Sequence, residues 1–94
     1  MVAFCFMAYY VYIIQSQISG DFYKGISQDV AKRVEHHNSG LSTFTKPFVP
    51  WVLVFVRSFP SKSEALKEEL RLKKCNRSYL EWIIKQPFNL LNKS

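Results

Sequence analysis

The sequence predicts a small α+β domain, in which a three-stranded antiparallel sheet is flanked by helices in the order β-β-α-β-α-α. Three runs rich in β-branched and aromatic residues predict the strands, because such residues favour extended structure. Amphipathic stretches that follow helix-capping residues predict the helices. The length of 94 residues fits one domain, and a composition that is 48% hydrophobic is ample for its core.

The first two strands are expected to form a β-hairpin. Residues 9–15 are apolar on both alternating faces, as in a central strand that is covered on both sides. Turn-forming residues 16–21 follow, and residues 22–26 resume the extended pattern. Residues 41–50 are read as a loop, and the run 51–59 is again apolar on both faces. That last run predicts a third strand that is internal or well covered.

Local signals mark the ends of the expected helices. The first helix is expected to start at Ser27 or Asp29 and to end before Ser39 and Gly40. The second starts at Ser61 or Ser63 and breaks near Cys75 and Asn76. The last runs from about Arg77 to Lys85 and is ended by Pro87. Residues 1–94 are therefore assigned to one domain, with an apolar leader at 1–8, a core at about 9–85 and a C-terminal tail at 86–94.

The apolar opening of the chain does not have the features of a membrane segment. It is about 14 residues long, whereas a helix needs about 20 to cross a bilayer, and it has neither a basic start nor a small-residue cleavage site. Cys5 and Cys75 are the only cysteines, which predicts free thiols in a reducing compartment. We therefore expect a cytoplasmic protein without a membrane partner, whose native start is either Met1 or Met7.

The charge balance favours a polyanionic partner. Thirteen Lys and Arg residues against seven Asp and Glu residues give a net charge of +6. The cations are spread along the chain, which predicts a basic surface built from several elements. Nucleic acid is the class of partner that such a surface fits best, although many small basic domains carry this charge for solubility alone.

Glu69 occupies an unusual position in the second helix. At 100° per residue it points into a broad arc of apolar residues, while Glu68 points away. The arc consists of Ala65, Leu66, Leu70 and Leu72. A carboxylate on a buried face needs a metal ion, a cation or a hydrogen-bond network as its partner. The simplest interpretation is an ion pair with Lys73, four residues later.

Four further side chains are expected on the inner faces of the elements to which they belong. In the first helix, Arg33 and His37 lie one turn apart on its inner side, and in the hairpin Tyr12 and Tyr23 are expected to be close neighbours. Gly25 predicts the close approach of another chain or a ligand to the second strand. Each residue alone has a structural explanation, such as a core histidine or a strand tyrosine. Together with Glu69 they predict one polar site.

In these segments the sequence resembles the GIY-YIG nuclease domain, found in the N-terminal part of a nucleotide-excision repair excinuclease, in some homing endonucleases and in small stand-alone bacterial proteins. The resemblance runs from about residue 9 to 85. Its segments are Tyr10-Val11-Tyr12, Tyr23-Lys24-Gly25, RVEHHNSG at 33–40, FTK at 44–46, a later PW, and EALKEE at 64–69. Tyr10 replaces a glycine of the first signature and Lys24 an isoleucine or valine of the second.

This resemblance implies a metal-dependent endonuclease that hydrolyses DNA phosphodiester bonds in repair or recombination. Glu69 stands at the metal-binding glutamate and would hold one Mg²⁺ or Mn²⁺ ion, with no small-molecule cofactor. Arg33 would clamp the phosphate. Tyr12 would take the proton of the attacking water, provided that the ion, Arg33 and Lys24 lower its pKa. Tyr23 would position the water or the phosphate. His37 would orient a tyrosine or relay the proton.

The expected partner is DNA, including branched and single-stranded forms, and its contacts are assigned to Lys24, Lys32, Lys46 and Lys73. Two other functions fit the same sequence. One is a catalytically silent module that binds nucleic acid or another partner on this fold. The other is a structural domain in which Glu69 only pairs with Lys73. Metal-dependent cleavage distinguishes the endonuclease from both alternatives.

Overall fold

The computed structural model describes residues 8–92 and confirms the predicted α+β fold. Its elements follow the expected order along the chain. They are β1 (Tyr9–Ser16), β2 (Phe22–Ser27), α1 (Val30–Asn38), the 3₁₀ turn η2 (Lys46–Phe48), β3 (Trp51–Phe59), α2 (Lys62–Lys73), α3 (Arg77–Ile84) and the 3₁₀ turn η3 (Leu90–Asn92).

The three strands form one antiparallel sheet in the order β2-β1-β3. The central position of β1 explains why its sequence is apolar on both alternating faces, and residues 11–14 are all fully buried. Tyr12 is paired with Gly25 on one side and with Val56 on the other. A register shift interrupts the pairing with β3 between Ile13 and Ile14.

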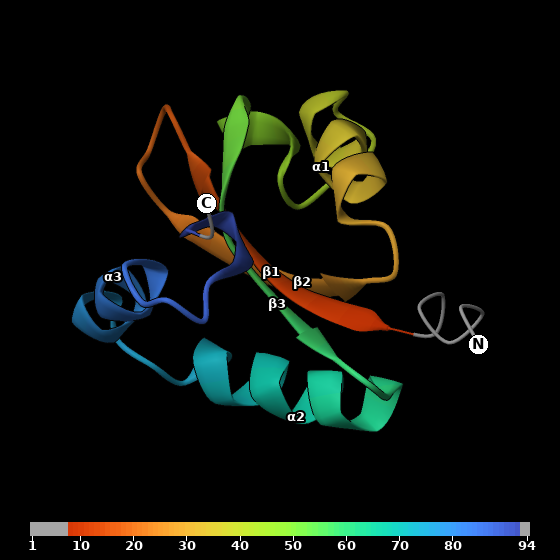
Figure 1. Cartoon of the computed structure of the whole chain (residues 1–94). Helices are drawn as coiled ribbons and strands as arrows, with labels where there is room; N and C mark the ends of the chain where they lie inside the picture. The colour runs from red at the N-terminus through yellow and green to blue at the C-terminus, as the bar shows by residue number, and fades with distance from the viewer. Residues whose placement is uncertain (1–7, 93–94) are drawn as a thin grey trace.

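The helices lie on opposite faces of the sheet (Figure 1). Val11 and Ile13 point to the face that α2 and α3 cover, where they pack with Leu72 and Ile83 in the larger core cluster. The alternate residues of β1 point to the face of α1, in a smaller cluster built around Tyr12, Ile14 and Trp51. A tyrosine therefore takes part in the core of the second face, directly below α1.

Side-chain caps set the helix starts. Asp29 accepts a hydrogen bond from the backbone N–H of Lys32, and Ser61 accepts one from Glu64. Each is one of the two candidates that the sequence offered for its helix. Asn76 caps α3 in the same way, so the break expected near this residue separates α2 from α3.

The segment expected as a C-terminal tail packs against the rest of the domain through Asn89. Asn89 is only 1% exposed, and its side chain joins two segments. Its Oδ1 accepts from the N–H of Val56, while its Nδ2 donates to the carbonyls of Val54 and Ile84. One amide thus satisfies backbone groups of β3 and of the end of α3, and so fixes the segment after Pro87 against the sheet.

The leader predicted at residues 1–8, together with Cys5 and Met7, lies outside the described residues except for residue 8. Among residues 8–92 no helix has the length and apolar character needed to cross a bilayer.

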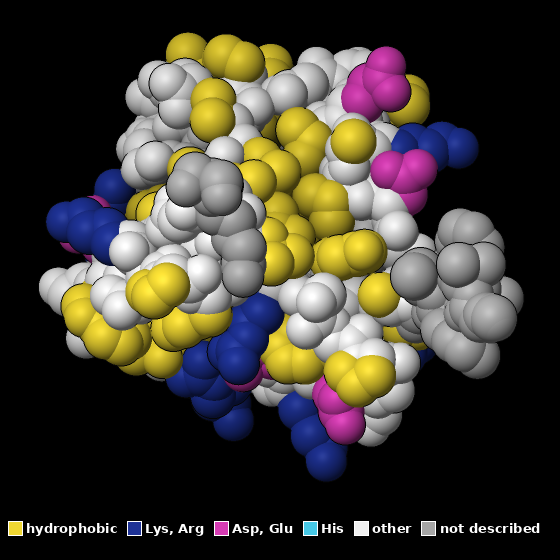
Figure 2. All heavy atoms as spheres, viewed as in Figure 1, with side chains coloured by type: hydrophobic (Ala, Val, Ile, Leu, Met, Phe, Trp, Pro, Cys, Tyr) yellow, Lys and Arg dark blue, Asp and Glu magenta, His cyan; other side chains and the backbone are white. Residues whose placement is uncertain are grey.

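On the face shown in Figure 2, Lys and Arg side chains gather in the lower part, where Figure 1 places α2, and apolar side chains occupy the centre.

Candidate active site

A chain of three buried polar side chains lies between the sheet and α1. The hydroxyl of Tyr12 is 2.9 Å from Nε2 of His37, and Nδ1 of His37 is 2.9 Å from Oγ1 of Thr45. All three residues are almost completely excluded from solvent. Because both nitrogens of His37 have a partner, the orientation of its ring is fixed.

The loop before β3 is held in place by two contacts that position Thr45. The side-chain amide of Asn38 accepts a hydrogen bond from the N–H of Trp51 and donates one to its carbonyl, in the manner of a neighbouring strand. The indole N–H of Trp51 in turn donates to the carbonyl of Thr45, at 3.0 Å. The end of α1, the loop and the start of β3 are thereby locked together beside His37.

Gly25 provides the space for the tyrosine ring. Tyr12 is its partner across β1 and β2, and a Cβ atom at position 25 would lie 2.6 Å from the Tyr12 hydroxyl oxygen. The group that approaches this glycine is the Tyr12 side chain of the paired strand, whereas the sequence had suggested another chain or a ligand. Tyr23 pairs with Ile14, which makes it a diagonal neighbour of Tyr12, and its ring meets that of His37 edge-on with the centroids 5.0 Å apart.

The electrostatics of this cluster favour neutral groups. Burial lowers the pKa of His37 to about 4, and the positive charges of Arg33 and His36 add to this effect. Burial also raises the pKa of Tyr12, which outweighs the lowering by Arg33, while Tyr23 and the negative charge of Glu69 raise it further. At neutral pH the imidazole is therefore uncharged and the phenol keeps its proton. The expected lowering of the Tyr12 pKa is not found in the protein alone.

Arg33 and Glu69 are both near enough to the cluster for their charges to affect its pKa values. Arg33 belongs to α1, and its charge acts on both Tyr12 and His37. Glu69 belongs to α2 on the other side of the sheet, yet its charge acts on Tyr12. The phenol extends over Gly25, which has no side chain, on the edge strand β2.

Glu68 and Glu69 differ in their partners and not in their burial. Each side chain is 13% exposed, so the expectation that Glu68 points away from the sheet is wrong. The inner face of α2 is centred on Ala65 and Leu72, and it is narrower than the predicted arc because Leu70 is 56% exposed. Helical periodicity alone placed the centre of the buried face too far toward Leu70.

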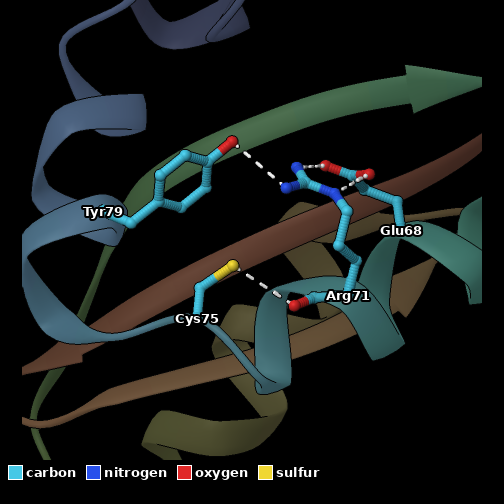
Figure 3. A network of polar contacts seen from close by, with 4 residues as sticks. All are labelled: Glu68, Arg71, Cys75 and Tyr79. Atoms are coloured by element: carbon cyan, nitrogen blue, oxygen red, sulfur yellow. Dashed lines mark hydrogen bonds and ion pairs between the residues drawn. The ribbon is translucent and has the colours of Figure 1, made fainter.

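Glu68 is fully engaged in a local network (Figure 3). Both of its oxygens accept from the guanidinium of Arg71, at 2.9 and 2.6 Å, and Arg71 also donates to the hydroxyl of Tyr79 at 3.1 Å. The thiol of Cys75 donates to the carbonyl of Arg71. Glu69 has only Lys73 as an ion-pair partner, at 3.5 Å, among the described residues. Of the two carboxylates, Glu69 is the one with coordination capacity left.

Comparison with known proteins places this cluster in a family. The family model of the GIY-YIG catalytic domain matches residues 8–90, and this span contains every side chain of the cluster. The chain belongs to the GIY-YIG family. The resemblance seen in the sequence is thereby confirmed.

Relatives of this GIY-YIG chain share most of its length. A UPF0213 protein of Halobacterium salinarum is 38% identical over 74 residues, which cover 78% of this chain and 95% of that protein. A UPF0213 protein of Staphylococcus aureus N315 is 38% identical over 80 residues, covering 84% and 96%. The solution NMR structure of UPF0213 protein BH0048 from Bacillus halodurans matches with a TM-score of 0.56 and 34% identity, covering 87% of each chain.

The donor set of this GIY-YIG domain fits a hard divalent ion better than a closed metal cage. Among residues 8–92 no three His, Cys, Asp or Glu side chains are grouped so that they could share an ion. A single carboxylate suits Mg²⁺, which keeps several waters and takes further oxygens from substrate phosphates. Glu69, with its remaining coordination capacity, is the residue that would hold such an ion.

The lysines assigned to DNA contacts lie on different elements. Lys24 is half-buried on β2 next to Tyr23, and Lys32 and Lys46 are exposed on α1 and η2. Lys73 is half-exposed and pairs with Glu69 in the protein alone. Within the described part of the chain, three of the four are therefore available to meet a phosphate backbone, while Lys73 is engaged within the site.

Thr45 and Asn38 were present in the segments that carry the family resemblance, but the sequence assigned no function to either side chain. Thr45 lies in a loop, where no periodicity indicates which way a side chain points. Asn38 is part of the RVEHHNSG segment and lies at the expected end of the first helix, but no role followed from either position. The signal that could have found both is their position in motif segments, because Asn38 directly follows the predicted inward His37 and Thr45 is the central residue of FTK.

Proposed function

We propose that this protein is a metal-dependent endonuclease that hydrolyses DNA phosphodiester bonds. The observation that carries the proposal is the buried hydrogen bond between Tyr12 and a neutral His37, within the field of Arg33. Membership of the GIY-YIG family supports a nuclease, and the net charge of +6 supports a nucleic-acid substrate.

The cluster provides a path for one proton. If Nδ1 of His37 donates its proton to Thr45, the lone pair of Nε2 faces the Tyr12 hydroxyl. As a water molecule attacks phosphorus, its proton passes to the Tyr12 oxygen, and the phenolic proton passes to Nε2. Tyr12 would then take the proton from the water, and His37 would be the acceptor that makes this transfer possible for a phenol whose own pKa is raised. Because Tyr12 is fully buried in the protein alone, DNA binding would have to admit the water to its hydroxyl.

Arg33 links substrate binding to this transfer. Its guanidinium suits the non-bridging oxygens of a phosphate, and it lies beside both members of the proton path. A bound phosphate would offset the positive charge that helps to lower the pKa of His37. The imidazole therefore becomes a better proton acceptor once the substrate is present. Tyr23, in edge contact with His37, would position the water or the phosphate.

Glu69 would hold one Mg²⁺ or Mn²⁺ ion, and Lys73 would then be released toward the DNA. When bound, such an ion neutralises negative charge on the phosphate and on the leaving 3′ oxygen. The 3′ oxygen takes a proton from solvent as its bond to phosphorus breaks. One phosphodiester and one water thus yield a phosphate monoester and an alcohol, which suits a step in repair or recombination.

The affinity for DNA is expected to come mainly from phosphate contacts. Lys24, Lys32 and Lys46 lie on three elements and add point charges rather than base-reading groups. Binding to duplex DNA should then weaken steeply with salt, with log K falling by about 0.9 per phosphate contact in log salt. A flat salt dependence would contradict this part of the proposal.

A cleavage assay on branched, nicked and single-stranded DNA with Mg²⁺ or Mn²⁺ tests the proposal. Wild type is compared with Glu69→Gln and with Glu68→Gln, a matched change in an equally covered carboxylate. We expect cleavage by wild type and by Glu68→Gln, and none by Glu69→Gln. Cleavage by Glu69→Gln at the wild-type rate contradicts the role of Glu69. DNA binding without cleavage by wild type indicates the silent binding module instead.

A further inference from the structure

An aromatic groove opens beside the candidate active site. Its volume is about 490 Å³, and it lies between the start of β2, the segment before β3 and the first part of α3. Tyr23 and Thr45 line it, and both also contact His37, so the groove begins where the proton path ends. A groove of this size lies within the range of about 300–1,000 Å³ that holds small organic groups.

The groove is built largely of aromatic rings with accessible faces. Phe44 is 76% exposed and Phe48 is 38% exposed, although both are large apolar residues. Phe44 packs against Tyr23 with the ring centroids 6.0 Å apart, and Phe48 meets Trp51 edge-on. Single exposed apolar residues are ordinary, but several rings around one groove next to a reaction site indicate a binding surface.

The charged groups of the groove suit stacking more than charge recognition. Lys24 and Arg77 line it, and Asp21 lies among them. The guanidinium of Arg77 lies 4.9 Å above the ring of Phe22 and also pairs with Glu81 on α3, so much of its charge is already compensated. What remains is a set of flat surfaces with Lys24 beside them, which is the chemistry of a base-stacking platform.

We propose that this groove holds an unpaired nucleobase next to the phosphate that is cut, so that the substrate strand is single-stranded at the site. The bases of a duplex are already stacked on each other and cannot present a face to Phe44, whereas every unpaired base can. This inference rests on the proposed function for the identity of the ligand as DNA, and it specifies the form of DNA that the site takes.

A binding experiment in EDTA tests the groove without catalysis. Fluorescence anisotropy measures the affinity of wild type for three 12-nucleotide probes, whose length corresponds to about one binding site. The probes are an oligothymidine, an abasic strand with the same phosphates, and a duplex. Wild type should bind oligothymidine about 5- to 150-fold more tightly than the abasic strand, which is the range expected for one stacked base. Phe44→Ala should remove most of this preference, and Phe44→Trp should restore it.

Trp82→Ala is the matched control, because Trp82 is a half-exposed aromatic residue of α3 that does not line the groove. It should leave all three affinities unchanged. Equal affinity of wild type for the abasic strand and oligothymidine would overturn the proposal, and so would an unchanged preference in Phe44→Ala. If wild type sediments as a dimer and Phe44→Ala as a monomer, the groove binds a second copy of the chain. This result would also overturn the proposal.

The outcome is separable from that of the proposed function. Base-dependent binding that requires Phe44, in a protein that cuts no DNA, supports the groove and contradicts the nuclease. In the opposite case, cleavage requires Glu69, but Phe44→Ala and wild type cut single-stranded DNA at the same rate at limiting substrate. This result contradicts the role of the groove and supports the nuclease.

Discussion

The ring of Tyr12 lies over Gly25, its partner on the edge strand, so closely that even a methyl group at position 25 would meet the phenol. The tyrosine hydroxyl at this contact lies 2.9 Å from Nε2 of His37, and the charge of Glu69 on α2 acts on it. The glycine therefore positions the reactive hydroxyl through the absence of a side chain.

Gly25→Ala should displace Tyr12 and break its hydrogen bond to His37. We expect unfolding free energy to fall by about 1–3 kcal/mol through overpacking, and cleavage to fall by about 100-fold through misplacement of the hydroxyl. Denaturant melts and single-turnover rates measure the two effects. In a Tyr12→Ala background the same glycine change should cost little stability. An equal cost in both backgrounds would show that the clash is not with Tyr12.

The low pKa of His37 makes stability depend on pH. The folded-state pKa is about 4 against an ordinary 6.5, so the unfolded chain binds this proton more readily. The stabilisation is therefore complete above pH 6.5 and is lost as the pH falls from 6.5 toward 4, by up to about 1.4 kcal/mol per unit. His37→Gln should flatten this part of the urea-derived stability profile, whereas His36→Gln should preserve its slope. A wild-type profile that is flat from pH 6.5 to 4 would contradict the burial of a neutral imidazole.

Thr45→Val should act through the orientation of His37. The change keeps the shape of the side chain but removes the oxygen that lies 2.9 Å from Nδ1. We expect kcat to fall by at least about tenfold, with a smaller change in KM than in kcat, because the hydroxyl belongs to the proton path while valine keeps the volume of the side chain where it lines the groove. Thr45→Ser retains the hydroxyl and should restore kcat. If serine and valine behave alike, the hydroxyl has no positioning role.

Divalent ions should stabilise the protein only through Glu69. At an ion concentration of 100 times Kd, thermal melts of wild type should show a gain of about 2.7 kcal/mol relative to EDTA. Glu69→Gln should gain nothing and should be at least as stable as wild type in EDTA, since a poorly paired, covered charge is removed. Glu68→Gln should lose stability because it leaves Arg71 without its partner, yet it should keep the ion-induced gain. An equal gain in Glu69→Gln would exclude Glu69 as the ligand.

Asn89→Ala should destabilise the fold although the residue lies near the C-terminus. It leaves backbone groups of Val54 and Val56 without their side-chain partner and removes one of the two hydrogen bonds to the carbonyl of Ile84, which we expect to cost about 2–4 kcal/mol. Asn92→Ala removes hydrogen bonds that are exposed, and should cost much less. Chemical denaturation of the two variants measures the difference, and equal losses would mean that residues 86–92 contribute as a solvated tail.

Patterns within single segments determined most of the fold. The run at residues 9–15 is apolar on both faces, as in a strand covered on two sides, and it forms the central strand. Residues 51–59 have the same pattern but form the edge strand β3, so the pattern alone did not settle the strand order. Asp29 and Ser61 marked helix starts through the chemistry of capping. Tyr12, Arg33 and His37 could be placed on inner faces because helical and strand periods are regular.

Relations between segments were decided only by the tertiary structure. Periodicity could not distinguish Glu68 from Glu69, because their engagement depends on where Arg71 and Lys73 reach and on which part of α2 meets the sheet. The partner of His37 on its far side comes from a loop whose path is set by Asn38 and Trp51. The direction of the Tyr12 pKa shift depends on burial, which only packing of α1 on the sheet creates, since a free strand would leave the phenol in water.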